Sequence, residues 1–157
     1  MALPKSAMNE TFGRLRLILA ASQERSEKAR QAAEAIRDAR AYHWVGLYDV
    51  TSTEIIVYAW SGAEAPAFPR FPVEQGLNGA AVRLGQPVVV QDVRADSRYL
   101  TTFGTTRAEA IFPVKSPATG SVLGTIDAES EEIEAFTPEE QMFLSSCAEL
   151  LLPLWFS

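Results

Sequence analysis

The chain has 157 residues, 47% of them hydrophobic and 22% charged, which is typical of one compact domain with a single core. Its 20 acidic residues outnumber the 14 basic ones, and a net charge of −6 repels a phosphate backbone, so we expect no nucleic-acid partner. No uncharged apolar run approaches the roughly 20 residues that span a bilayer, so we expect no membrane partner. The single cysteine, Cys147, excludes an intramolecular disulfide and predicts a reducing, cytoplasmic location.

Two helices are predicted before residue 42. In residues 9–21, Phe12, Leu15 and Leu19 recur at helical spacing. Residues 22–41 are rich in Ala, Glu, Arg and Lys and contain no Gly or Pro, which is typical of an exposed helix. Ser22 is the predicted N-cap of this second helix.

The pattern then changes to β-branched and aromatic residues. Residues 42–50 and 54–60 predict two strands of a hairpin, joined by the short turn between them. Both strands are apolar on both faces, which indicates central strands covered on both sides. Residues 61–72 contain a glycine and three prolines and predict a loop long enough to cover a site.

Short elements separated by turn residues follow this loop, and their punctuation by Gly and Pro sets their limits. In chain order they are a helix at 76–85, a strand at 87–92, a second long irregular segment at 93–107, and strands at 108–114 and 121–129.

A last helix is predicted from its start signals. Thr137 is the expected N-cap, Pro138 suits the first helical position, and Glu140 stands where a capping box has its acid. Cys147 lies on the apolar stripe of this helix, so we expect it to be buried and unreactive.

The strand at 121–129 carries an unusual pair of acids, Asp127 and Glu129, two residues apart. Alternation places both on one face with Thr125. An unpaired carboxylate inside a strand costs several kcal/mol or becomes protonated, so Asp127 requires a partner. Three sources are open: a ligand amino group, water, or an arginine from the loops. Glu129 has an equally good interpretation as a strand end in water. The candidate arginines are Arg70, Arg98 and Arg107.

The order of elements, together with "HWVGLYDV" (43–50), "IFPV" (111–114) and the GxxGxAxxxGxPxxxxD stretch at 76–92, resembles a GAF domain. Within that class the chain is similar to free methionine-(R)-sulfoxide reductases. The tracts that carry this narrower resemblance are "HWVGLY" (43–48), the stretch from "RFPVEQGLNG" to "RAEAIFPV" (70–114) and "GTIDAES" (124–130). The resemblance implies an α+β fold: a central mixed or antiparallel sheet, with N-terminal and C-terminal helices on one face and ligand-chamber loops on the other. It implies a single domain over 1–157, with N-terminal helices in 1–41, the sheet and chamber loops in 42–130, and a C-terminal helix at 137–155.

The resemblance ends at the reductases' thiol chemistry. Those enzymes attack the sulfoxide sulfur with a cysteine thiolate and resolve the product through a second cysteine. Matched tract to tract, the family's cysteine positions fall on Phe68, Asn78 and Thr102, none of which is a thiol. The family's chamber acids match three carboxylates that this chain retains. They are Glu109, Asp127 and Glu129.

The resulting expectation is a stand-alone GAF-type small-molecule-binding or sensor domain for signal transduction, without catalytic activity. Its ligand is expected to be amino-acid-like or cationic. A divergent free methionine-(R)-sulfoxide reductase and a structural dimerisation module remain alternatives. The candidate ligand-binding residues are Trp60 and Phe68 as apolar walls, with Asn78, Thr102, Glu109, Asp127 and Glu129.

Three further expectations concern partners and cofactors. The apolar end of the chain, Leu154, Trp155 and Phe156, predicts a homodimer built on the N-terminal and C-terminal helices. His43 is the only histidine and is expected to be a hydrogen-bonded structural residue rather than a haem ligand. No cofactor and no metal site are expected.

Overall fold

Six strands form one sheet in the order β3-β2-β1-β6-β5-β4 in the computed structural model, which describes residues 5–156. Every pair of neighbouring strands is antiparallel. Of the two expected kinds of sheet, the antiparallel one is confirmed and the mixed one is wrong. The strands are β1 (Trp44–Val50), β2 (Glu54–Gly62), β3 (Arg70–Pro72), β4 (Val88–Val90), β5 (Ala108–Lys115) and β6 (Val122–Ser130).

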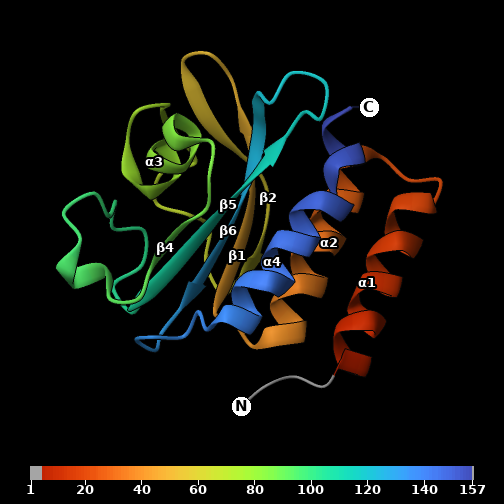
Figure 1. Cartoon of the computed structure of the whole chain (residues 1–157), viewed down its shortest axis with the longest axis horizontal. Coiled ribbons are helices and arrows are strands. Elements are labelled where there is room, and N and C mark those ends of the chain that lie inside the picture. The colour runs from red at the N-terminus through yellow and green to blue at the C-terminus, as the bar shows by residue number, and fades with distance from the viewer. Residues whose placement is uncertain (1–4, 157) are drawn as a thin grey trace.

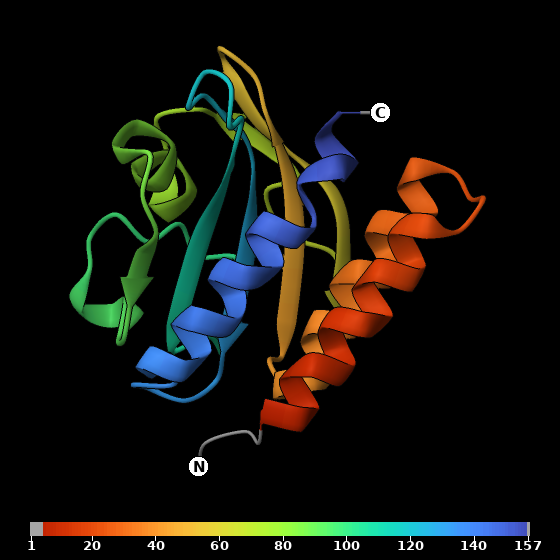
Figure 2. The ribbon, with the colours of Figure 1, turned by 45° about the vertical axis from the view of Figure 1, so that its right-hand side comes forward.

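The helices separate into two groups, one on each face of the sheet (Figures 1 and 2). The long helices are α1 (Lys5–Ala20), α2 (Arg25–Arg40) and α4 (Pro138–Leu150), and the short helix is α3 (Gly76–Leu84), with 3-10 turns at Val93–Ala95 and Leu152–Trp155. On one face α2 and α4 pack against the sheet, α1 packs against those two helices, and all three share a core with the sheet. The short helix and the irregular segments cover the other face. This is the predicted α+β arrangement.

Alternation along β6 divides its side chains as predicted. Ile126 and Ala128 join the core beneath the long helices. Thr125, Asp127 and Glu129 face the other way, and all three are buried. The loop-facing side of the sheet is therefore covered rather than open to water.

Several local predictions differ from the structure. The second helix begins at Arg25, with Glu24 at the N-cap position and no side-chain cap, so Ser22 does not cap it. The segment at 61–72 is not entirely loop, because its end pairs with β2 as the edge strand β3. Strand β2 is less covered than predicted, since only Ile55 and Ala59 in it are buried. It lies next to that short edge strand, away from the centre of the sheet.

The start of α4 has half of the predicted capping box. The Thr137 hydroxyl accepts a hydrogen bond from the Glu140 backbone N–H, as an N-cap should. The Glu140 carboxylate does not return to the cap; it pairs instead with Arg40 and Tyr42, which lie on and just after α2. Cys147 is fully buried in this helix, as predicted.

The end of the chain packs on its own sheet. Leu154 is buried, and the Trp155 indole N–H donates to the Tyr48 carbonyl at 3.3 Å. Gly124 makes room for this ring, because a Cβ at residue 124 would lie 2.1 Å from Trp155 Nε1. Of the three residues that suggested a second subunit, only Phe156 remains largely exposed.

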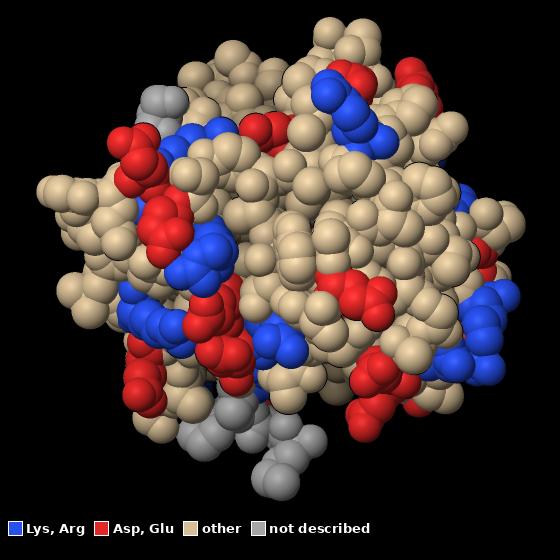
Figure 3. All heavy atoms as spheres, turned by 180° about the vertical axis from the view of Figure 1, so that it is seen from behind, with Lys and Arg blue, Asp and Glu red and all other residues tan. Residues whose placement is uncertain are grey.

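Within residues 5–156, no helix is both long enough and apolar enough to cross a bilayer. On the face seen in Figure 3, acidic and basic side chains are intermixed, and neither sign forms a continuous area.

Candidate ligand chamber

Three carboxylates meet on the loop-facing side of β5 and β6. Glu109 lies directly opposite Glu129 in the β5–β6 register, and Asp127 is two residues before Glu129 on the same face. One oxygen from each of the three lies within 4.8 Å of the other two. None of these side chains is more than 5% exposed. The sheet register therefore concentrates three acids within reach of one positively charged group.

Burial dominates the electrostatics of this cluster. Loss of solvation raises the pKa of all three carboxyl groups, that of Asp127 to about 6 and those of Glu109 and Glu129 well above their ordinary range. The neighbouring negative charges raise the pKa of Glu109 and Glu129 further. No ion pair among residues 5–156 involves the cluster. Without an added cation, the chamber therefore binds protons.

Asn78, from α3, holds one oxygen of Asp127. Its side-chain N–H₂ donates to Asp127 Oδ2 at 3.1 Å, and its own carbonyl accepts from the Thr125 hydroxyl at 2.5 Å. The Thr125 contact fixes the orientation of the amide, because only the nitrogen end is then free to face Asp127. The Glu109 carboxyl, which donates when it is protonated, and this amide both oppose the effect of burial on the Asp127 pKa.

The second oxygen of Asp127 has no hydrogen-bond partner among the described residues, although it is buried. Asp127 lines a small, partly enclosed cavity of ≈ 20 Å³, room for about one water molecule. Such an oxygen is the natural contact for a ligand donor. The residues that line the cavity are Tyr48, Phe68, Phe71, Gly76, Leu77, Asn78, Leu100, Thr102, Glu109 and Asp127.

Five of the seven predicted site residues line this cavity, namely Phe68, Asn78, Thr102, Glu109 and Asp127. Glu129 lies beside it, fully buried and bound by the Thr106 hydroxyl at 2.9 Å, so its interpretation as a strand end in water is wrong. Trp60 does not line the cavity. It packs, partly buried, in the apolar cluster around Trp44 on the same side of the sheet.

The arginines that remained open as partners of Asp127 do not bind it. Arg70 pairs with Glu54, and Arg98 pairs with Asp96. Arg107 donates to the backbone carbonyls of Gly104 and Thr106. Each guanidinium therefore has a nearby partner at the surface. The hydrogen-bond donor that the structure gives Asp127 is the Asn78 amide.

Two residues of the site carried no signal in the sequence. Thr106 lies in the irregular segment before β5, and only the folded loop brings its hydroxyl to Glu129. Tyr48 reads as an ordinary strand aromatic. It lines the cavity because its place on β1 is directly opposite Thr125 of β6. The Trp44 ring lies against Gly46 of the same strand.

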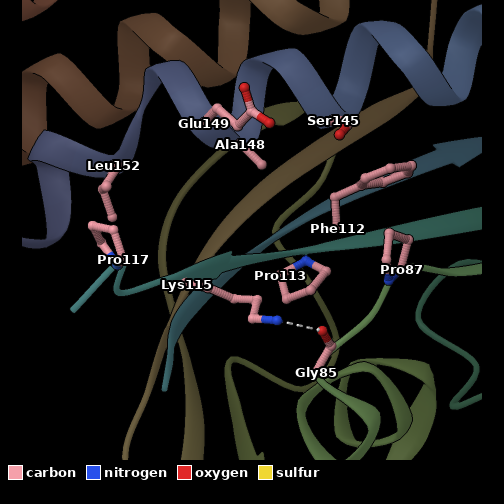
Figure 4. Close-up of a pocket in the computed structure, with 10 residues that line it drawn as sticks. All are labelled: Gly85, Pro87, Phe112, Pro113, Lys115, Pro117, Ser145, Ala148, Glu149 and Leu152. Carbon is pink, nitrogen blue, oxygen red and sulfur yellow. Dashed lines mark hydrogen bonds between the residues drawn. The ribbon is translucent and has the colours of Figure 1, made fainter. Parts of the chain in front are cut away.

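A larger hollow of ≈ 410 Å³ lies between α4 and β5 (Figure 4). It is an open groove whose lysine, Lys115, already donates to the Gly85 carbonyl at 3.0 Å. Glu149 on α4 is its other charged residue, and no member of the acidic cluster lines it. The smaller chamber is the better candidate because three buried carboxylates meet beside it and one of their oxygens has no hydrogen-bond partner among the described residues.

The comparisons with known proteins agree with this geometry. The family profile described as "GAF domain" matches residues 24–151. The structure of the type II free methionine-R-sulfoxide reductase from Thermoplasma acidophilum is 30% identical, with a TM-score of 0.77, covering 84% of this chain and 95% of that chain. The free methionine-R-sulfoxide reductase from Neisseria meningitidis, in complex with its substrate, is 26% identical, with a TM-score of 0.87 and coverage of 99% and 93%.

A putative GAF sensor protein from Burkholderia vietnamiensis, 22% identical with a TM-score of 0.80 and coverage of 96% and 92%, shares the fold. No curated protein sequence matches the chain at a significant level. The antiparallel sheet, the long helices on one face, the covered acidic chamber on the other and the match over residues 24–151 lead to one conclusion: this chain belongs to the GAF domain family.

Proposed function

We propose that this GAF domain is a small-molecule sensor whose chamber receives the cationic group of its ligand and performs no reaction on it. The observation that carries the proposal is the buried Asp127 Oδ1, which has no partner among the described residues although two more carboxylates are close by. A buried carboxylate oxygen without a donor is costly, and a ligand ammonium group would reduce that cost.

The walls of the chamber define the rest of the ligand. Phe68, Phe71 and Leu100 are apolar and lie around the carboxylates, so an uncharged, apolar portion suits the ligand beside its cationic group. An amino acid or a simple amine has this composition. The similarity to enzymes named for a free amino-acid derivative supports the same class.

The chamber must open to bind such a ligand. A cavity of ≈ 20 Å³ holds one water-sized group, far less than an amino acid. Its cover comes from the two irregular segments, with Phe68 from the first and Thr102 from the second. We propose that these segments separate for entry and close over the bound ligand, as lids commonly do.

A divergent free methionine-(R)-sulfoxide reductase is the second candidate, favoured by the 30% identity to the Thermoplasma enzyme. It requires a thiolate in the chamber. Asn78 and Thr102 line the cavity at family thiol positions without a sulfur, and Cys147 is buried in α4 on the helix-covered side. These residues support binding without catalysis.

The test is a calorimetric and thermal-shift screen of amino acids and amines, each paired with a neutral analogue of the same shape. We expect cationic compounds to bind the wild type and to lose at least about tenfold in affinity with Asp127→Asn. Glu132→Gln, a change at an exposed acid outside the chamber, is the matched control and should bind as the wild type does. Preference for neutral or anionic compounds would contradict the proposal, as would equal binding of cationic compounds by the wild type and Asp127→Asn.

Two broader features complete the proposal. We propose a homodimer through α1, α2 and α4, supported by the exposed apolar side chains of Leu17 on α1 and Met142 on α4 and by Phe156. Light scattering at micromolar concentration should give twice the 17.2 kDa of one chain. The lone buried cysteine supports a cytoplasmic location.

A further inference from the structure

A chain of side-chain hydrogen bonds leads from the acidic chamber to the outside of the sheet. Thr106 Oγ1 lies 2.9 Å from Glu129 Oε1, and on its other side it lies 2.8 Å from His43 Nε2. Glu129 and Thr106 are almost completely buried, whereas His43 is half-buried. The imidazole is therefore the solvent-side end of a three-residue path.

Two contacts hold the His43 end of the path in place. The His43 backbone N–H donates to the Glu129 carbonyl at 3.0 Å, which holds the two strands' ends together. The Phe103 ring meets the imidazole edge-on at 5.6 Å. Thr106 has a single hydroxyl proton and cannot donate to both neighbours at once. The path therefore has two arrangements, and donor and acceptor exchange roles in both of its hydrogen bonds between one arrangement and the other.

In the first arrangement Glu129 is protonated and donates to Thr106, which in turn donates to the bare Nε2 of His43. In the second, Glu129 is a carboxylate that accepts from Thr106, and Thr106 accepts from His43 Nε2–H. The change between them balances as follows. The Glu129 proton moves to Thr106, the Thr106 proton moves to Nε2, and the proton on His43 Nδ1 leaves to water.

We propose that Thr106 and His43 carry to solvent the proton that Glu129 releases when a cation enters the chamber. This role rests on the proposed function, because the cation is the ligand group expected there. The two residues are positioning residues, since neither touches the chamber's ligand space. The consequence is that the tautomer of the surface histidine reports the charge of a carboxylate in the chamber.

The charges around His43 keep it neutral enough for this role. Burial lowers the pKa of the imidazole, the nearby Glu131 raises it, and Arg37 lowers it. Arg37 also donates to the His43 backbone carbonyl at 3.3 Å. The Glu129 carboxyl, in contrast, has a pKa well above its ordinary range because it is buried beside Asp127, although the hydroxyls of Thr106 and Tyr99 lower it. Tyr99 and Glu109 are the other titratable groups that face Glu129. The other charged residues of the groove that His43 lines are Arg40, Glu132, Glu134 and Glu140.

The test uses the fact that the chain has one histidine, so its imidazole nitrogens give unambiguous NMR signals. In ¹⁵N-labelled, ligand-free protein titrated from pH 6 to 10, we expect Nε2 to change from unprotonated to protonated as Glu129 ionises. Asp127→Asn removes a repelling charge beside Glu129 and should lower the midpoint of this change by about one pH unit or more.

Three variants separate a relay from a purely structural contact. Thr106→Val removes the hydroxyl with little change of shape and should abolish the pH-dependent tautomer change. Thr106→Ser keeps the hydroxyl and should retain it, and Thr101→Val, at an exposed threonine, is the control. One tautomer throughout the titration, or the same change in Thr106→Val, would overturn the relay.

Methylammonium chloride then serves as the minimal cationic probe. We expect it to move the tautomer midpoint of the wild type to lower pH by favouring ionised Glu129. Calorimetry on the same samples measures methylammonium binding directly. Binding that leaves the midpoint unmoved overturns proton release on cation entry while the proposed function stands. No binding up to high millimolar concentration contradicts the proposed function, and the inference fails with it.

Discussion

The Asn78 amide on α3 and the Asp127 carboxylate on β6 form a buried hydrogen bond of 3.1 Å across the floor of the chamber. The resemblance to the reductases matches Asn78 to one of their cysteine positions. In this chain the position holds a donor that stabilises the negative charge of its neighbour. The contact therefore makes α3 a support for the charge of Asp127.

Asn78→Ala is the most direct test of that support. The change leaves Asp127 Oδ2 and the Thr125 hydroxyl without their buried partner, and hydrogen bonds to charged groups contribute about 1.5–3 kcal/mol. We expect affinity for a cationic ligand at pH 7 to fall about tenfold or more, measured by calorimetry. Asn9→Ala, at an exposed asparagine in α1, is the matched control. Unchanged affinity in Asn78→Ala would show that Asp127 needs no support.

The sequence predicted this fold well because its signals are local. Alternation at 124–130 assigned the two faces of β6, and Thr137 with Pro138 marked the start of α4. Burial of Cys147 followed from helical spacing. Each of these depends on residues a few positions apart, which is where periodicity and capping act.

The site was predicted less completely because its contacts are long-range. The pairing of Glu109 with Glu129 follows from the β5–β6 register, which no short pattern specifies. Thr106 reaches Glu129 only through the path of an irregular loop. None of the candidate arginines binds Asp127, for a related reason. Each of them binds an acid or a backbone carbonyl close to it in the fold.

The stability of the ligand-free protein should fall as the pH rises from 5 to 8 on account of Asp127. Its pKa is about 6 in the fold against an ordinary 3.8, so the fold favours the protonated form. That stabilisation is complete below pH 3.8 and is lost as the pH rises through about 6. At pH 8 the ionised, buried carboxylate costs about 3 kcal/mol.

Asp127→Asn should therefore raise the free energy of unfolding, and by more at pH 8 than at pH 5, in urea titrations at both pH values. Comparing the variant with the wild type at each pH cancels the opposite contribution of His43, whose pKa is lowered. Asp96→Asn is the sign control, because Arg98 lowers the pKa of Asp96 and its loss should give no gain. An equal effect of Asp127→Asn at the two pH values would contradict the assignment of a raised pKa.

The ion pair of Arg40 with Glu140 should matter far more to stability than the surface pairs. The two side chains are 4% and 12% exposed, and the Tyr42 hydroxyl donates to the same carboxylate at 2.6 Å. Glu140→Ala leaves a buried guanidinium without its anion, which costs about 3–5 kcal/mol. Glu54→Ala removes the acid of an exposed pair with Arg70 and should change little. Denaturant unfolding of both variants gives the comparison, and similar losses would contradict it.

The chain should not reduce free methionine sulfoxide with a thiol donor above the uncatalysed rate. The reaction needs a thiolate at the sulfoxide sulfur, and the three family thiol positions hold Phe68, Asn78 and Thr102. Cys147 cannot substitute for them, because it is fully buried in α4 and burial raises the pKa of its thiol. Turnover is measured as methionine released from each sulfoxide epimer in the presence of dithiothreitol. Wild type and Cys147→Ser should both match the protein-free blank. Turnover by the wild type that Cys147→Ser abolishes would establish a reductase with a displaced nucleophile, and the covering segments and α4 would then have to move far enough to bring that sulfur into the chamber.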